Sequence, residues 1–161
     1  MLFLPILALN FGAENIVTGT SDDRRALIDW GVFHVEQTYL TLFKDYNKTL
    51  KHRNKILKSK NIDNLDYWTK LLSEKGEQLN VLRENYFKQL CDCFKQYKDS
   101  IVRNIPDIYA DIKNISISYN KGWPKSLALE SAMMQSTNKD ILLKHTTTGP
   151  HRSDRLFTSH N

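Results

Sequence analysis

Hydrophobic residues in the middle of the chain recur with the spacing of paired helices. Between Tyr39 and Leu57 they are separated alternately by four and three residues, and the same spacing returns between Leu65 and Ile101, after a polar break at residues 61–64. A heptad pattern gathers its apolar positions along one seam, so the sequence predicts an antiparallel helical hairpin whose first arm is about 35 Å long and whose second is longer. The expected seam is Tyr39, Phe43, Tyr46, Leu50, Arg53 and Leu57, then Leu65, Trp68, Leu72, Leu79, Leu82, Tyr86, Cys93, Tyr97 and Ile101.

Shorter elements are predicted on both sides of this hairpin. Residues 1–17 contain two apolar stretches with the pattern of short strands, and Ser21 is the expected N-cap of a helix that begins at Asp22. Beyond the hairpin, ISISY (115–119) alternates as a strand does, residues 126–143 have a helical pattern, and TTTGPHRSDRLF predicts strand, turn and strand. The predicted fold class is α+β, mostly α.

The stretch RRALIDWGVFHVE (24–36) concentrates charge, aromatic rings and a glycine just before the hairpin. A packed corner of the core and a working site are both compatible with its composition. We expect its aromatic half, with Trp30 and Phe33, to be core, and Gly31 to allow close packing or a bend at a hinge. The functional assignment falls on Arg24 and Arg25.

The chain has 161 residues, a net charge of +5 and ordinary apolar and charged fractions of 40% and 25%, which is consistent with one globular domain. Basic residues are concentrated between positions 44 and 60, where seven Lys and Arg face one Asp. Five lysines are spaced by four and three residues on what would be the outer face of the first arm: Lys44, Lys48, Lys51, Lys55 and Lys58. Such a ridge either follows a phosphate backbone or keeps an exposed helix solvated.

The remaining chemistry of the sequence is sparse. Cys91 and Cys93 lie two residues apart in a predicted helix, so they point to different faces and suit buried apolar positions better than a metal clip. No His-Glu-x-x-His, Ser-His-Asp or phosphate-cradling glycine motif occurs, so no catalytic residue and no metal site are predicted. The apolar start MLFLPILAL is too short to span a bilayer, and a cytoplasmic location without membrane contact is expected.

A second charged cluster follows Gly149-Pro150. The turn displays His151, Arg152 and Asp154, where an arginine could clamp a phosphate while the aspartate orients it. An ordinary charged β-turn accounts for the same residues, and local chemistry leaves both interpretations open.

Three segments together resemble the RecF family of DNA replication and recombinational-repair proteins. They are IVTG followed by RRALIDWGVFHVE, then LKHRN (50–54), then TTTGPHRSD (146–154), with a Gly122-Trp123 turn between the last two. Order and spacing cover essentially the whole chain. The resemblance implies an ABC-type ATPase head, of the SMC and Rad50 group, with a helical arm inserted between its lobes. Residues 1–34 would end the first lobe, 35–110 would form the arm, and 111–161 would return into the second lobe.

The resemblance also implies a function. RecF-like proteins bind ATP with Mg²⁺, form ATP-dependent homodimers, bind single-stranded and gapped duplex DNA, and work with RecO and RecR to load RecA in recombinational repair and the SOS response. The family's Walker A, signature and Walker B motifs are absent from these 161 residues, so the chain is expected to be an internal piece that neither holds ATP nor hydrolyses it alone. Arg24, Arg25, His151 and Arg152 are expected on the nucleotide or DNA face, and the lysine ridge is a candidate DNA contact. The alternative is an arm that binds a protein partner without touching DNA.

Overall fold

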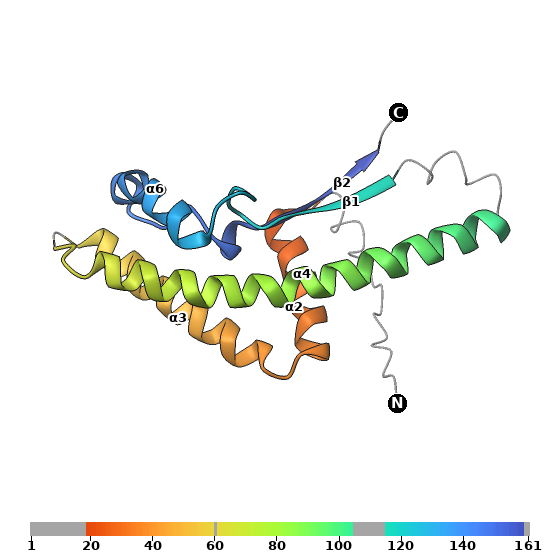
Figure 1. Ribbon diagram of the computed structural model, residues 1–161, viewed down its shortest axis with the longest axis horizontal. Coiled ribbons are helices and arrows are strands. Elements are labelled where there is room, and N and C mark those ends of the chain that lie inside the picture. The colour runs from red at the N-terminus through yellow and green to blue at the C-terminus, as the bar shows by residue number, and fades with distance from the viewer. Residues whose placement is uncertain (1–18, 60, 105–114, 160–161) are drawn as a thin grey trace.

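The computed structural model describes residues 19–59, 61–104 and 115–159 (Figure 1). These residues form four α-helices and one two-stranded antiparallel ribbon, so the mostly helical class is confirmed. The elements are α2 (Ser21–Val35), α3 (Tyr39–Lys58), α4 (Leu65–Asn104), β1 (Ile115–Asn120), α6 (Leu129–Leu143), the 3₁₀ turn η2 (Pro150–Arg152) and β2 (Asp154–Ser159). The strands expected in residues 1–17 lie outside the described residues.

The predicted hairpin is present. α3 runs back along the first half of α4, and the buried seam includes Tyr39, Tyr46, Leu72 and Leu79. At 1.5 Å per residue the 40 residues of α4 extend about 60 Å, so α4 continues far beyond the end of α3 (Figure 1). The second half of α4 runs beneath the β ribbon, and α2 crosses near its middle (Figure 1).

The heptad seam does not continue along the whole of α4. Cys93 and Tyr97 were expected in the seam but are exposed, and Tyr97 is 66% accessible. Phe87, Leu90 and Cys91 pack against the core instead. Past Tyr86 the helix no longer faces α3 but faces α2 and β1, so a different stripe of its surface is buried. The expectation that both cysteines are buried is therefore wrong for Cys93.

The α2 helix begins one residue earlier than expected, because Thr20 is the N-cap and not Ser21. Thr20 Oγ1 accepts the Asp23 backbone N–H (3.3 Å), and the Asp23 carboxylate accepts the Thr20 N–H (2.8 Å), which together form a capping box. The hydrogen bond from the Thr20 hydroxyl, followed by that from its backbone N–H, lowers the pKa of Asp23. The capping box defines the start of α2 at the surface.

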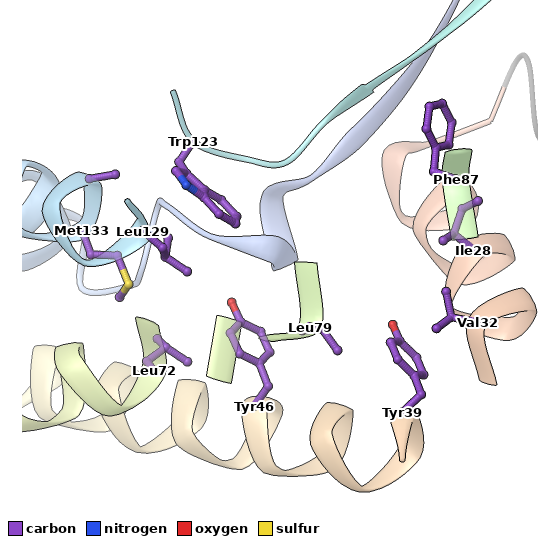
Figure 2. Packing of buried hydrophobic residues seen from close by; sticks show 11 residues of the cluster. Ile28, Val32, Tyr39, Tyr46, Leu72, Leu79, Phe87, Trp123, Leu129 and Met133 are labelled. Carbon is purple, nitrogen blue, oxygen red and sulfur yellow. The ribbon is translucent and has the colours of Figure 1, made fainter. Parts of the chain in front are cut away.

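In the described part of the chain, one apolar cluster joins α2, α3, α4 and α6. Ile28 and Val32 of α2, Tyr39 and Tyr46 of α3, and Leu72, Leu79 and Phe87 of α4 meet Trp123, Leu129 and Met133 from the second half of the chain (Figure 2). In β1 the predicted alternation holds, since Ile117 and Tyr119 pack against this cluster while Ser116 and Ser118 are exposed. The ribbon and α6 therefore share a core with the hairpin.

Two boundaries in the second half differ from the sequence prediction. The helix expected from residue 126 begins at Leu129, whose backbone N–H donates to Glu77 Oε1 of α4 (2.6 Å). The first strand expected in TTTGPHRSDRLF is a loop, because Thr146 and Thr147 donate to side chains of α3 and α6 and not to a neighbouring strand. The second strand is present as β2, which pairs with β1.

Gly31 lies within the continuous helix α2, so the bend expected there is wrong and the chain turns after Val35 instead. Close packing at Gly31 is confirmed, because a Cβ at this position would overlap the phenol of Tyr86. The aromatic half of the stretch is not core: Trp30 is 38% and Phe33 45% exposed. Both rings lie against His34 of the same helix, with centroids 4.3 and 5.2 Å from the imidazole.

We expect Gly31→Val to lower the free energy of unfolding by about 1–3 kcal/mol, since the added side chain overpacks the contact between α2 and α4. Urea unfolding of the variant measures the loss. When Tyr86 is also replaced by leucine, Gly31→Val should cost less stability than it does in the unmodified chain. The smaller side chain vacates the volume that the added valine would overlap. An unchanged unfolding midpoint in Gly31→Val contradicts the packing assigned to Gly31.

Candidate nucleic-acid interface

A row of lysines covers the outward face of α3. Lys44, Lys48, Lys51, Lys55 and Lys58 are all exposed, which confirms the position predicted for them. The first four line a groove of about 420 Å³ together with Phe43, Asn47 and His52. Asp45, the acidic residue of this stretch, lies 3.4 Å from Lys75 Nζ on α4. The lysine ridge is thus a continuous basic surface along the arm.

Arg53 points in the opposite direction from the lysine ridge, into the protein. Its side chain is fully buried, and its Nη1 lies 2.7 Å from Oδ2 of the equally buried Asp140 of α6. Nε donates to Thr69 Oγ1 on α4 (2.9 Å), and Nη1 also donates to Thr146 Oγ1 (2.7 Å). One guanidinium therefore joins α3, α4, α6 and the loop after α6.

The neighbouring Asn54 and the partner carboxylate Asp140 hold the same loop. Asn54 Oδ1 accepts both the backbone N–H and the hydroxyl of Thr146, each at 2.8 Å. Asp140 Oδ1 accepts the N–H (2.9 Å) and the hydroxyl (2.7 Å) of Thr147. The Arg-Asn pair of LKHRN thereby anchors TTTGPHRSD, so two segments that are distant in sequence form one buried polar cluster.

The arginine pair of α2 meets the start of β2. Arg24 donates from Nε and Nη2 to the two carboxylate oxygens of Asp154 (2.8 and 3.0 Å), and this hydrogen bonding raises the Arg24 pKa. Arg25 donates to the Ser153 carbonyl (2.6 Å) and to Asp22 (2.5 Å). Both arginines thus bind the far end of the GPHRSD segment.

A second ion pair, between a buried arginine and a half-buried aspartate, was not anticipated from the sequence. Arg83 of α4 donates from Nε and Nη2 to Asp29 of α2, both at 2.8 Å, and from Nη1 to the Pro150 carbonyl (2.8 Å). Tyr39 Oη donates to Asp29 Oδ1 (2.6 Å). Burial lowers the Arg83 pKa, but Asp29 and then Tyr39 outweigh it and the net pKa is raised. Asp29, in the DWG element, was the sign of this ion pair in the sequence. Its partner Arg83 lies 54 residues away, so no local pattern connects the two.

His151 lies half-buried where α2, α3, α4 and η2 meet, a place that we call the junction. Its Nε2 lies 3.1 Å from the Thr146 carbonyl, which only accepts, so Nε2 carries the proton. Nδ1 then accepts from Tyr46 Oη (2.7 Å). Burial lowers the His151 pKa to about 4, and Arg152 and Arg25 add to this, against the Thr146 carbonyl and Asp140. Burial likewise raises the Tyr46 pKa above its ordinary value. His151 is therefore a neutral side chain at pH 7.

The lysine ridge adjoins the junction. A hollow of about 450 Å³ between α2, α3, α4 and η2 is lined by Asp22, Arg25, Ala26, Asp29, Phe43, Tyr46, Asn47, Arg83 and His151. Phe43 and Asn47 also line the lysine groove, so the two hollows share a wall. The structure brings Arg25 and His151 next to the ridge.

Arg152 faces another surface. It is exposed and lines a hollow of about 580 Å³ with Gly122, Trp123 and Lys125 at the end of the β ribbon. Gly122 has φ of 95°, and its carbonyl accepts the Gly149 N–H (3.3 Å), so the Gly122-Trp123 turn rests on the GPHR turn. Of the four predicted face residues, Arg24, Arg25 and His151 are engaged in internal contacts, while Arg152 is displayed.

The described residues hold no group of three or more His, Cys, Asp or Glu side chains placed to bind a metal ion. Within the same residues, no helix is both long enough and apolar enough to cross a membrane.

No protein-family model matches the chain. It is 31% identical over 159 residues to a DNA replication and repair protein of Pseudoalteromonas translucida, and 32% identical over 160 residues to one of Acinetobacter baylyi. These matches cover 96% and 97% of this chain but 42% of each relative. The chain is thus similar, over nearly all its length, to part of DNA replication and repair proteins.

The particular protein that it resembles is RecF, the name carried by both relatives, and the chain is a RecF-like segment. Two solved structures of the recombination mediator protein RecF in the RecFOR pathway, with ATPrS and with ATP, have the same fold, with TM-scores of 0.74 and 0.69 at 23% and 25% identity. They match 93% and 91% of this chain and 42% and 40% of their own. The chain spans about two fifths of the RecF proteins that it matches.

Proposed function

We propose that this chain is the arm-bearing part of a RecF-like DNA replication and repair protein, and that its lysine ridge contacts the DNA backbone. The observation that carries the proposal is the sorting of charge on α3. Five lysines lie exposed along one face, whereas Arg53 of the same helix is buried and paired with Asp140. Lysines with no buried structural role are free to neutralise phosphates and release counterions.

The proposal also covers the domain arrangement and the activity of the whole protein, as the resemblance implies them. Residues 1–34 end the first lobe of an ABC-type ATPase head, 35–110 form the arm and 111–161 return into the second lobe. The whole protein binds ATP and Mg²⁺, dimerises around ATP in the cytoplasm, and works with RecO and RecR to load RecA at gapped DNA during replication, recombination and the SOS response. The solved structures of RecF with ATPrS and with ATP, as part of the RecFOR pathway, support this setting.

The four residues predicted on the nucleotide or DNA face take two roles in this proposal. Arg152 is exposed beside Lys125, so it is the candidate for direct contact with a phosphate of DNA or nucleotide. Arg24, Arg25 and His151 hold that face in place through Asp154, Ser153 and Tyr46. Their side chains stabilise the junction from which the arm leaves the head.

Charge reversal on the ridge tests the proposed function. We expect Lys48→Glu with Lys55→Glu to weaken binding of a duplex oligonucleotide by roughly 10- to 100-fold near 0.1 M salt, and to reduce the salt slope of log K by about two, because two phosphate contacts are lost. Fluorescence anisotropy across a salt series measures both quantities.

The matched control is Lys88→Glu with Lys139→Glu, which makes the same change of net charge at exposed positions on α4 and α6. It is expected to leave the salt slope near that of the unmodified chain. Equal effects of the two double variants would mean that net charge, and not the lysine ridge, determines binding, and the proposal would then fail.

The alternative, a helical arm that binds a protein partner without DNA contact, has its own supporting observation. Trp30, Phe33, Val35 and Leu40 are all exposed around the turn between α2 and α3. Exposed apolar patches mark interaction surfaces. If the chain shows no salt-dependent DNA affinity, while Phe33→Ser abolishes association with RecR or RecO, the alternative is the correct reading.

A further inference from the structure

We infer that the arm carries a base-stacking site for single-stranded nucleic acid, formed by His52 of α3 with Tyr67 and Trp68 of α4, next to the lysine ridge. This inference rests on the proposed function and specifies which form of nucleic acid the arm engages.

Three aromatic rings are gathered near the turn of the hairpin. The rings of His52 and Trp68 are stacked, with centroids 4.7 Å apart and planes 13° apart. Tyr67 meets Trp68 edge-on at 5.5 Å and 85°. His52 is exposed and Tyr67 is 63% accessible, so the cluster presents ring surface to solvent and does not close into the core. Of these three residues, the heptad pattern had predicted only Trp68 to lie in the core seam.

The cluster continues directly from the basic groove. His52 is itself a lining residue of the groove formed by Lys44, Lys48, Lys51 and Lys55. On α3 it lies four residues after Lys48, on the same helix face. A strand whose phosphates follow the lysines therefore passes His52, whose ring stacks on Trp68.

This combination of charge and ring surface favours a single strand over a duplex. Proteins that bind single strands use a positive groove for the backbone and aromatic side chains on which bases stack. In a duplex the base faces are already covered by neighbouring bases, so the lysines would engage it while the rings would not. An acidic protein segment would be attracted by the same lysines, but it has no planar bases to stack on His52 and Tyr67.

The test compares three ligands of equal length: a 20-residue oligo(dT), an abasic 20-residue phosphodiester strand, and a 20-base-pair duplex. The variant is His52→Ala with Tyr67→Ala. We expect its Kd for oligo(dT) to rise at least about fivefold, since the stacking of bases on aromatic side chains contributes to single-strand affinity to at least this extent. Its Kd for the abasic strand and the duplex should stay within twofold, and its salt slope should not change.

Two further variants separate stacking from local distortion. Tyr67→Phe keeps the ring and should bind oligo(dT) as the unmodified chain does. Tyr97→Ala removes a ring of similar exposure, 66%, from the distant half of α4 and should have no effect. Thermal melting of each variant checks that the hairpin is folded.

Each outcome either supports or overturns the stacking site. If the double alanine variant binds oligo(dT) normally while Lys48→Glu with Lys55→Glu does not, the ridge binds phosphates only and the stacking site is overturned, although the proposed function stands. If it weakens the abasic strand as much as oligo(dT), the rings do not stack on bases. If neither double variant changes the affinity for oligo(dT), the proposed function fails as well. The interpretation that the arm binds a protein partner is then favoured.

Discussion

Asp140→Ala is expected to lower the free energy of unfolding by about 3–5 kcal/mol, because it leaves the buried Arg53 guanidinium without its counter-charge. The Thr147 N–H and hydroxyl, which both donate to Asp140 Oδ1, lose their acceptor in the same step. Single domains have total stabilities of only about 5–15 kcal/mol, so the loss is a large fraction of the whole. Urea unfolding followed by circular dichroism measures it.

Two comparisons assign the loss to the buried charge. Asp140→Asn combined with Arg53→Met removes both charges while keeping an acceptor for Thr147, and it should recover most of what Asp140→Asn alone loses, since a buried pair replaced by neutral groups is often nearly neutral in stability. Asp92→Ala breaks the exposed 4.0 Å pair with Lys95 and should cost less than about 1 kcal/mol. An Asp140→Ala loss as small as that of Asp92→Ala would contradict the role given to the Arg53 cluster.

Acid is expected to destabilise the protein through His151. The folded-state pKa of this imidazole is about 4, whereas an unfolded histidine titrates near 6.5, so the unfolded state binds the extra proton first. Stability from neutral His151 is therefore complete above about pH 6.5 and decreases as the pH falls towards 4. A pKa lowered from near 6.5 to about 4 corresponds to about 3 kcal/mol of folding stability lost at the acid end.

The matched variant is His151→Gln, whose amide can accept from Tyr46 and donate to Thr146 but does not titrate. Unfolding free energies of both proteins are measured from pH 7.5 to pH 4. The two proteins share every other ionisable group, so the difference between the two curves isolates His151. Parallel curves would show that desolvation does not lower the pKa of His151 and would contradict this prediction. A steeper fall in the unmodified chain, confined to the window between about 6.5 and 4, is the expected result.

The fold was predictable where its pattern is local. The hairpin, the strand at residues 115–119 and the outward row of lysines all follow from a helical or strand period, because the period determines which side chains share a face. The same reasoning failed past Tyr86, where Cys93 and Tyr97 are exposed. There the buried stripe of α4 depends on α2 and β1, which are not its neighbours in the sequence.

The candidate site was only partly predictable. Arg53 was recognisable as the polar member of an apolar seam, but its partner Asp140 is 87 residues away and no spacing rule connects them. The segments LKHRN and TTTGPHRSD were identified separately, while the hydrogen bonds that join them at Thr146 became visible only in the folded chain. For the same reason the paired Asp29 and Arg83 were missed.

By itself, the sequence determined that this chain is mostly helical, that it carries a hairpin arm with a basic outer face, and that it resembles RecF. The tertiary structure alone decided which charged residues are available for binding. It placed four arginines against carboxylates or carbonyls: Arg24, Arg25, Arg53 and Arg83. It left the lysine ridge of α3 and Arg152 at the surface. The physical reason is that the state of a charge depends on burial and on partners from distant elements, which a local pattern of polar and apolar residues does not encode.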